Sequence, residues 1–388
     1  MRSLRQAVVT GLGAVSPFGL GAAPLWSAVR QGRPRFDAYA PSSDDLPPLP
    51  PLLGARIEPF NAREILGRKG LRAVNYESRL LLAALLEASR AAGIDNEDYP
   101  PTRRGVFMGT RRAGLDDYVR FHVERLVWGP ERVSPTRGPN TGFNAPASHA
   151  AIRYDLQGPN LTFSSRGCSS IDSIGHAADW IALGRVDLMY AGGIDCLSYP
   201  VARDRSLDAP ANEPPRPYDR RRQSAVPSEG AAVLVLEDEQ IARVREVEVL
   251  ARVETWSTAF DPEDPARALS RCLQGVEADA VVASACGDRR HDASEACAIA
   301  QTLGEIPVCA VQGCTGDWEG ASGALQLLVA THALVHQVLP PTVGFEEQDP
   351  DLPELSLRAT PTSMPLRRVV ATSVTPSGRA SALTLVRD

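Results

Sequence analysis

The sequence lacks the features that would place the protein in a membrane or build it around disulfides. None of its apolar runs is long enough to cross a bilayer, and residues 1–6 lead straight into a strand-like run without forming a leader. The seven cysteines show neither a C-x-x-C pair nor a His–Cys ligand spacing. We therefore expect a cytoplasmic protein with reduced cysteines, no metal site and no cofactor.

The chain also has no excess of positive charge. Its net charge is −6 over 388 residues, which gives no general reason to bind nucleic acid or an anionic membrane. Hydrophobic residues make up 43% of the chain, which is enough for one large core or two fused cores.

Short apolar runs rich in β-formers alternate with amphipathic helical runs, and this alternation predicts layered α/β structure. Strands are expected at residues 6–10, 104–108, 160–163, 188–191, 231–236, 280–283 and 368–372. Helices are expected at residues 25–31, 77–92, 171–183, 266–277, 292–302 and 320–336. Residues 41–51 and 207–217 are rich in proline and are expected to be surface loops.

One segment carries the strongest functional signal. The apolar run at 160–163 enters a turn that delivers Cys168 to the start of the helix expected at 171–183. Free N–H groups and the positive end of the helix dipole lower the pKa of a thiol at such a position, so Cys168 is placed like a nucleophile. The alternative is a buried cysteine that acts as a small hydrophobic residue.

Five further motifs surround this segment. They are Val8-Val9-Thr10-Gly11-Leu12-Gly13-Ala14-Val15-Ser16-Pro17-Phe18-Gly19, Gly158-Pro159-Asn160-Leu161-Thr162, Ala191-Gly192-Gly193, Arg216-Pro217-Tyr218-Asp219 and Ser228-Glu229-Gly230-Ala231-Ala232. In this order and spacing, the chain resembles the β-ketoacyl synthases of the thiolase fold, through Gly316 and Gly320-Ala321-Ser322-Gly323-Ala324 to the last strand. The resemblance implies a five-layer αβαβα fold made of two duplicated halves, residues 1–240 with Cys168 and residues 241–388.

The resemblance also reveals changes at the catalytic positions. In the family the cysteine works with two histidines, one in a His-Gly-Thr-Gly-Thr loop and one in a Gly-His pair. The first position falls at Ser284, Ala285 or Cys286, in a loop anchored by downstream acids, and the second is Asp317. An ionised carboxylate cannot donate the N–H that polarises a thioester carbonyl.

Two more family positions differ. The lysine five residues before the Gly-His pair is Gln312, and the Gly-Phe-Gly-Gly loop reads Thr375-Pro376-Ser377-Gly378. Pro376 has no N–H to offer a developing oxyanion, and losing one such donor costs ~3 kcal/mol of transition-state stabilisation. We expect condensation by this chain to be slow at best.

The remaining histidines have ordinary interpretations. His176 lies eight residues after Cys168, about two helical turns away, which is too far to deprotonate the thiol. His332 and His336 have an i,i+4 spacing but no third ligand, so a solvated helix end is favoured over a metal site. His291, several positions away from the lost loop histidine, is a candidate to replace it.

Three functions remain open. The favoured one is a non-condensing subunit resembling chain-length factors, which form heterodimers with a ketosynthase in type II polyketide, polyene or fatty-acid-like assembly. The second is a Cys168-dependent acyltransferase acting on acyl-carrier-protein or coenzyme A thioesters, and the third is a divergent β-ketoacyl synthase. Pro376 weakens both enzymatic alternatives, because acyl transfer also develops charge on the carbonyl oxygen. The retained Cys168 is unusual for a chain-length factor, in which glutamine often takes this place.

We expect the partners to be a ketosynthase, or a second copy of this chain, and an acyl carrier protein. The strand at 160–163 is expected to be an edge strand that pairs across a two-fold axis, with residues 109–147 covering part of the same surface. Arg222 is expected to pair with a buried acid, whereas Arg220 and Arg221 can meet an acidic carrier protein.

Overall fold

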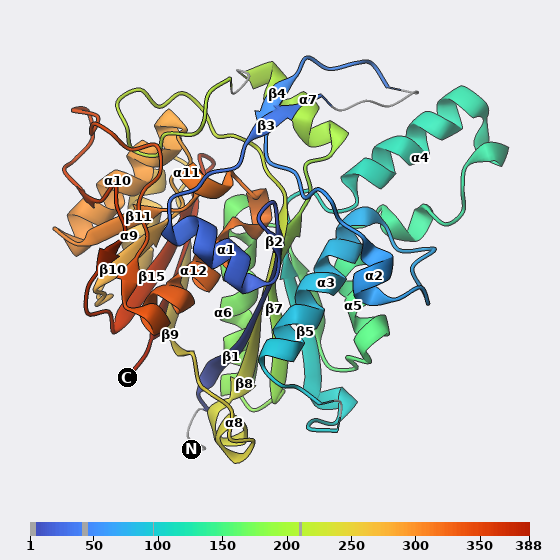
Figure 1. Ribbon diagram of the computed structural model, residues 1–388, viewed down its shortest axis with the longest axis horizontal. Coiled ribbons are helices and arrows are strands. Elements are labelled where there is room, and N and C mark those ends of the chain that lie inside the picture. The colour runs from blue at the N-terminus through green and yellow to red at the C-terminus, as the bar shows by residue number, and fades with distance from the viewer. Residues whose placement is uncertain (1–4, 41–45, 96, 209–211) are drawn as a thin grey trace.

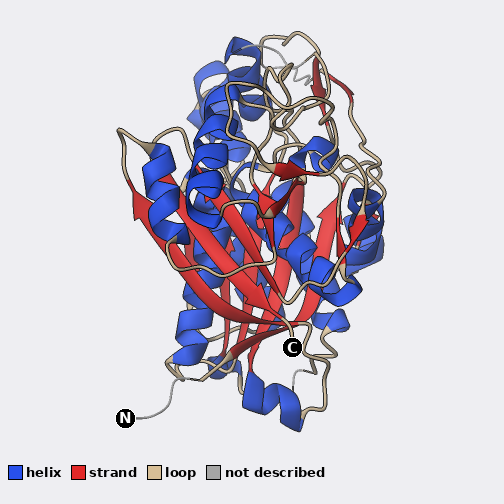
Figure 2. Cartoon of the chain, turned by 90° about the vertical axis from the view of Figure 1, so that its left-hand side faces the viewer, coloured by secondary structure: helices blue, strands red, loops and turns tan. Residues whose placement is uncertain are grey.

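Two β-sheets joined edge to edge form the centre of the protein (Figure 2). The structure is a computed structural model that describes residues 5–40, 46–95, 97–208 and 212–388. The first sheet has the strand order β6 (Asn160–Phe163), β5 (Arg104–Gly109), β7 (Leu188–Asp195), β8 (Gly230–Asp238), β1 (Ala7–Ser16). The second has the order β13 (Ser356–Leu357), β11 (Pro307–Ala310), β10 (Ala280–Ala283), β15 (Arg368–Val374), β16 (Arg379–Val386), β9 (Ala251–Phe260).

The two sheets repeat one topology. In the first, β5 pairs in parallel with β6 and β7, and β8 pairs antiparallel with β7 and β1. In the second, β10 pairs in parallel with β11 and β15, and β16 pairs antiparallel with β15 and β9. The sheets meet where β1 pairs with β9, at Val8–Arg252 and Val9–Ala251.

Helices complete a five-layer arrangement. They are α3 (Tyr76–Ala91), α5 (Ala145–Tyr154), α6 (Ser169–Ala182), α9 (Pro265–Leu273), α10 (Arg289–Leu303) and α12 (Ser322–His336). In the middle layer, α6 and α12 contact each other and both sheets, while α3 with α5 and α9 with α10 cover the outer faces. The thiolase-like αβαβα fold of two duplicated halves, predicted from the sequence, is confirmed.

The middle layer depends on close helix approach. A Cβ atom on Gly323 of α12 would lie 2.6 Å from Cγ1 of Ile171 and 3.0 Å from its backbone nitrogen, so only glycine lets α12 approach α6 this closely. Each helix is preceded by a 3₁₀ turn, η4 (Arg166–Cys168) before α6 and η5 (Glu319–Ala321) before α12. The beginnings of the two central helices therefore lie next to each other.

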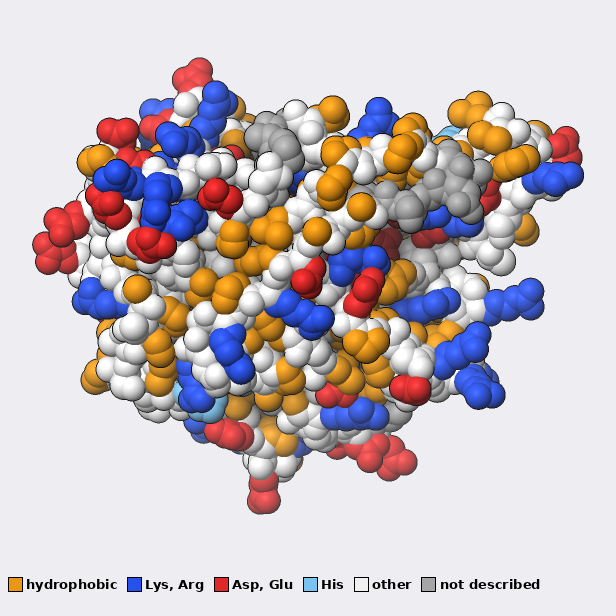
Figure 3. All heavy atoms as spheres, turned by 45° about the horizontal axis from the view of Figure 1, so that its top comes forward, with side chains coloured by type: hydrophobic (Ala, Val, Ile, Leu, Met, Phe, Trp, Pro, Cys, Tyr) orange, Lys and Arg blue, Asp and Glu red, His pale blue; other side chains and the backbone are white. Residues whose placement is uncertain are grey.

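The other elements lie around this body. They are α1 (Ala22–Arg30), α2 (Ala62–Leu66), α4 (Leu115–Trp128), α7 (Tyr199–Asp208), α8 (Glu239–Val244), α11 (Gln312–Thr315), η1 (Pro101–Arg103), η2 (Pro130–Arg132), η3 (Gly138–Asn140), β2 (Gly19–Leu20), β3 (Asp37–Tyr39), β4 (Leu52–Gly54), β12 (Val338–Leu339) and β14 (Thr362–Ser363). Helix α4 projects from the body (Figure 1). Leu126 and Trp128 are among its exposed apolar side chains, and apolar side chains gather at the upper right of Figure 3.

Two loop predictions can be compared with these elements. Residues 46–51 have no helix or strand, as expected, while residues 41–45 lie outside the described part. The expectation of a loop beginning at residue 207 is wrong at its start, because α7 continues to Asp208; residues 209–211 lie outside the described part. In the residues that the structure describes, no helix has the length and apolar character needed to cross a bilayer.

Candidate functional site

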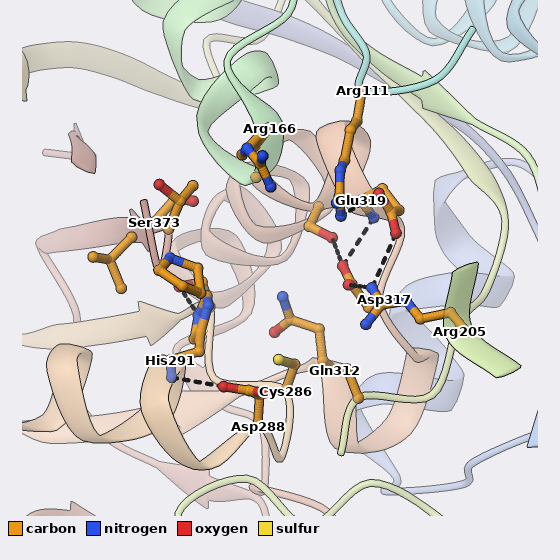
Figure 4. A pocket seen from close by; sticks show the side chains of 17 residues that line it. Arg111, Arg166, Arg205, Cys286, Asp288, His291, Gln312, Asp317, Glu319 and Ser373 are labelled. Carbon is orange, nitrogen blue, oxygen red and sulfur yellow. Dashed lines mark hydrogen bonds and ion pairs between the residues drawn. The ribbon is translucent and has the colours of Figure 1, made fainter. Parts of the chain in front are cut away.

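A cavity of ≈ 190 Å³ lies where the two halves meet, at the beginnings of α6 and α12 (Figure 4). Its walls come from η4, η5, α7, α10, α11, the loop after β10 and the end of β15. The lining residues are Arg111, Arg166, Gly167, Arg205, Ala225, Ser284, Cys286, Asp288, His291, Gln312, Asp317, Glu319, Ser322, Ser373, Val374, Thr375 and Pro376.

A buried carboxyl group joins the two halves beside this cavity. Asp195, at the end of β7, accepts hydrogen bonds from Oγ1 of Thr110 and from the backbone N–H groups of Arg111, Arg112 and Gly320, at 2.8, 2.8, 2.9 and 2.8 Å. Burial, together with a nearby acid, raises the pKa of Asp195 to about 7. Through these bonds the end of β5 and the beginning of α12 are fixed to one side chain.

One wall of the cavity is a network of ion pairs. Arg205 of α7 lies 2.7 Å from Asp317 and 2.9 Å from Glu319, and Arg111 lies 2.6 Å from Glu319 (Figure 4). Asp317 also accepts hydrogen bonds from the backbone N–H of Glu319 at 2.8 Å and from Oγ of Ser322 at 3.1 Å. Burial alone would raise the pKa of Asp317, but the Arg205 guanidinium and this N–H group hold it below its usual value. Asp317 is therefore a fixed, ionised group.

The opposite wall is held by Glu295 of α10. Its carboxylate accepts hydrogen bonds from the backbone N–H and Oγ of Ser284, at 2.8 and 2.7 Å, and from Tyr218 at 2.8 Å. Nε2 of His291 lies 2.9 Å from Oγ of the same serine. Asp292 accepts the N–H of Cys286 at 3.0 Å. The downstream acids thus anchor the loop after β10, and His291 reaches the cavity from α10.

Cys168 lies behind the cavity wall. Its side chain is fully buried, and its sulfur lies 3.6 Å from Oγ and 3.7 Å from the backbone oxygen of Ser373, and 3.7 Å from the backbone oxygen of Arg379. Arg166 and Gly167 line the cavity in front of it. Burial raises the pKa of the Cys168 thiol to about 12.

Gln312 and Pro376 both line the cavity. Gln312, on α11, is 2% exposed, and its amide oxygen has no hydrogen-bond partner among the described residues. Pro376 sits in the turn that connects β15 to β16, where the N–H of Gly378 donates to the oxygen of Thr375 at 2.9 Å. Proline supplies no N–H at its position in this turn.

Two sequence profiles decide the family. The profile described as β-ketoacyl synthase, N-terminal domain, matches residues 5–242, and the profile described as β-ketoacyl synthase, C-terminal domain, matches residues 241–346. The chain belongs to the β-ketoacyl synthase family.

Members of this family are similar to this chain along most of their length. The chain is 28% identical over 378 residues to a 3-oxoacyl-[acyl-carrier-protein] synthase 2 of Coxiella burnetii, covering 89% of each chain. It is 29% identical over 385 residues to the tetracenomycin polyketide synthase ketoacyl synthase alpha subunit of Streptomyces glaucescens, again covering 89% of each chain.

Solved structures in the family show the same fold. A β-ketoacyl synthase from Burkholderia phymatum superposes with a TM-score of 0.88 at 25% identity, covering 99% of this chain and 100% of that one. The ishigamide ketosynthase/chain length factor superposes with a TM-score of 0.89 at 24% identity, covering 99% and 100%. A ketosynthase in complex with its chain length factor from Xenorhabdus doucetiae gives 0.83 at 21% identity, covering 99% and 98%.

The expectation about the pKa of the Cys168 thiol is wrong. The helix start was expected to lower the pKa of its thiol, but the pKa is raised because the sulfur has lost its contact with water. The other altered family positions, Cys286, Gln312, Asp317 and Pro376, all line one cavity. Of the three positions considered for the loop histidine, Ser284 and Cys286 reach the cavity, and Ala285 is buried outside it.

The other histidines lie elsewhere. His176 stacks on Phe163 with ring centroids 5.1 Å apart, outside the cavity. His332 and His336 both stack on Trp26, and burial lowers the pKa of His332 to about 4. The interpretation as a solvated helix end fits only the exposed His336. No group of metal-ligating side chains occurs in the part of the chain that the structure describes.

The basic segment after α7 is engaged in ion pairs. Arg222 pairs with Asp349, and both side chains are almost completely buried, which confirms the expected structural pair. The exposed Arg220 and Arg221 pair with Glu347 and Glu346.

Sequence reasoning missed the charged residues of the cavity, which are Arg111, Arg166, Arg205 and Glu319. Arg205 and Asp317 are 112 residues apart in the chain, and no local pattern connects them. Arg166 stands two residues before Cys168, so its place in the turn that precedes α6 was the available sequence signal.

Proposed function

We propose that this member of the β-ketoacyl synthase family is a non-condensing subunit that pairs with an active ketosynthase in acyl-chain assembly of the type II polyketide, polyene or fatty-acid kind. One observation carries the proposal. At the place expected for the reacting groups, Cys168 is sealed behind the wall and Asp317 is locked in an ion pair with Arg205.

Each change removes a specific contribution to condensation. A thiol with a pKa of about 12 is almost entirely protonated at neutral pH, and the thiolate is the nucleophile. An ionised Asp317 would repel the enolate that forms when a malonyl group loses carbon dioxide. General acid–base groups contribute roughly 100-fold or more each, so their loss leaves little catalysis.

The surface around β6 supports pairing with another subunit. Strand β6 ends the sheet and, within the described chain, pairs only with β5. Leu161 on this strand is 45% exposed. Helix α5 contacts β6, and Ile152 on α5 and Phe143 just before it are also exposed. An edge strand with exposed apolar side chains is a surface that native proteins normally cover. Similar structures that contain a ketosynthase with a chain length factor or a carrier protein support these kinds of partner.

All seven cysteines are free. Reduced thiols are usual in the cytoplasm, so we place the action of the proposed subunit there.

The test is co-expression with ketosynthases encoded beside this chain, followed by affinity purification and sedimentation. We expect a stable one-to-one complex that an acyl carrier protein can bind. A monomer at micromolar concentration, with and without every candidate partner, would refute the pairing role.

His291 favours a second candidate, a divergent β-ketoacyl synthase. Its imidazole reaches the cavity beside Ser284 and Cys286, so a general base is available although both family positions have changed. Condensation by the wild-type chain that is lost both in His291→Ala and in Cys168→Ala would favour this candidate. The third possibility, acyl transfer through Cys168, predicts a stoichiometric acyl adduct by intact mass that disappears in Cys168→Ala; the burial of the sulfur argues against it.

A further inference from the structure

Gln312 presents an amide group that nothing in the protein satisfies. The residue is 2% exposed and lines the cavity, and its amide oxygen is buried without a partner. Among the described residues, no hydrogen bond from its amide nitrogen occurs either. Figure 4 shows this side chain extending from α11 into the cavity. Buried amides are nearly always paired, which points to a ligand.

Arg166 supplies a positive charge on the other side of the same space. It lines the cavity from η4 and points into it (Figure 4). Among the described residues, Arg166 forms no ion pair, whereas Arg111 and Arg205 are neutralised by Glu319 and Asp317. Asp288 also lines the cavity, and its carboxylate accepts hydrogen bonds from the backbone N–H groups of Arg290 and His291 at the start of α10. Arg166 is therefore the arginine of the cavity lining that has no ion-pair partner among the described residues.

We propose that this cavity binds a short carboxylic acid that also carries an amide group. The carboxylate pairs with the guanidinium of Arg166, which offers a fork of N–H donors. The ligand amide N–H donates to Oε1 of Gln312, and Nε2 of Gln312 donates to the ligand carbonyl oxygen. Oε1 and Nε2 of Gln312 then both have a hydrogen-bond partner in the planar amide group of the ligand.

The size of the cavity supports a small ligand. Its ≈ 190 Å³ is less than the roughly 300–1,000 Å³ typical of pockets for drug-sized molecules. A three- or four-carbon acid amide fits this space better than a long acyl chain. Binding is non-covalent, and it concerns this chain alone, so it does not depend on the proposed pairing with a ketosynthase.

Malonamate is a suitable probe because it has one carboxylate and one primary amide separated by a single carbon. Propionate has only the carboxylate, and malonamide has only amides. Binding to the purified full chain would be measured by calorimetry and by ligand-dependent thermal stabilisation. We expect malonamate to bind at least tenfold more tightly than either of the other two compounds.

Two substitutions assign the contacts. Gln312→Leu keeps the approximate shape and removes the unsatisfied amide, so the variant should fold, and it should bind malonamate no better than propionate. Arg166→Ala should bind malonamate no better than malonamide. Arg30→Ala, which removes an exposed arginine of α1, is the matched control and should leave the affinity unchanged.

The proposal fails if malonamate binds no more tightly than propionate or no more tightly than malonamide. It also fails if Gln312→Leu and Arg166→Ala each retain the wild-type affinity for malonamate. Should Gln312→Leu not fold, Gln312→Glu is the replacement, since its carboxylate would repel the ligand and lower the affinity at least tenfold. Pairing is measured by sedimentation and ligand binding by calorimetry, so either proposal can fail without the other.

Discussion

Loss of contact with water determines the pKa of the Cys168 thiol at the beginning of α6. A helix terminus stabilises a charge by about 0.3–1 kcal/mol, whereas raising the pKa of Cys168 from 9.0 to about 12 corresponds to a cost on the order of 4 kcal/mol for the thiolate. The burial effect is several times larger than the dipole effect. The sulfur also contacts Ser373 and Arg379, so a cysteine here serves packing.

We therefore expect Cys168 to resist alkylation. At pH 8, iodoacetamide should label it at least 100-fold more slowly than it labels the same cysteine in urea, because the thiolate becomes abundant only near pH 12. Peptide mass spectrometry gives the rate for each cysteine, with the half-buried Cys297 as internal reference. Labelling of Cys168 in the native protein as fast as in urea would show that the thiol is open to solvent.

The pH dependence of stability should reveal the Asp317–Arg205 pair. Because the pKa of Asp317 is lower in the folded than in the unfolded protein, its stabilisation is complete above the unfolded value of 3.8 and is lost as the pH falls through the folded value. Asp317→Asn should lower the free energy of unfolding by roughly 1.5–3 kcal/mol at pH 7, the contribution of a hydrogen bond to a charged group, since Arg205 keeps Glu319 as its ion-pair partner. The difference from wild type should shrink with acidification.

Urea unfolding at pH 7 and pH 3 measures this difference, and Glu263→Gln, an exposed acid elsewhere, is the control. A difference that is equal at both pH values would show that Asp317 is not held as a carboxylate. Asp317→His should not restore condensation, because Gln312 and Pro376 remain.

At the scale of elements, the contact between η5 and the end of β5 fixes the beginning of α12. A Cβ atom on Gly320 would lie 2.5 Å from the backbone nitrogen of Arg111 and 2.8 Å from Oδ2 of Asp195. Gly320→Ala should therefore lower the free energy of unfolding by about 1–3 kcal/mol. Gly138→Ala, where an added Cβ meets nothing within 4 Å, should change it by less than about 0.5 kcal/mol. Equal unfolding curves for the two variants would contradict this packing.

Strand β6 provides the second element-scale prediction. Leu161→Lys places a charge on the exposed edge next to β5, so the chain should become monomeric or precipitate, as judged by sedimentation. Val244→Lys, on an 84% exposed side chain of α8, should leave the assembly unchanged. An unaltered dimer in Leu161→Lys would show that the interface lies elsewhere.

The sequence predicted those elements whose apolar periodicity is strong. Strands β1, β5, β6, β7, β8, β10 and β15 and helices α1, α3, α6, α9, α10 and α12 lie where their patterns indicated, with shifted ends, whereas α5 was not predicted. Strands β9 and β16 were missed because polar residues interrupt them, such as Glu254 in β9 and the buried Ser381 in β16. Helix α4 was also missed, although apolar residues such as Leu115, Tyr118 and Val119 recur along it at helical spacing.

At the scale of the molecule, the cavity is a product of the duplication. Arg166 and Gly167 come from the first half, and Gln312, Asp317 and Pro376 come from the second. We propose that residues 1–240 and 241–388 are these two halves. The family resemblance identified the altered positions Cys286, Gln312, Asp317 and Pro376. The ion pairs of the site join distant segments and depend on side-chain geometry that no spacing encodes.

The central claim is that this chain does not condense acyl groups by itself. Its most direct test is release of labelled carbon dioxide from malonyl-carrier protein by the purified wild-type chain in the presence of an acyl-carrier substrate. The account predicts no release above that of Cys168→Ala under identical conditions. Multiple turnovers by the wild-type chain that disappear in Cys168→Ala would contradict it.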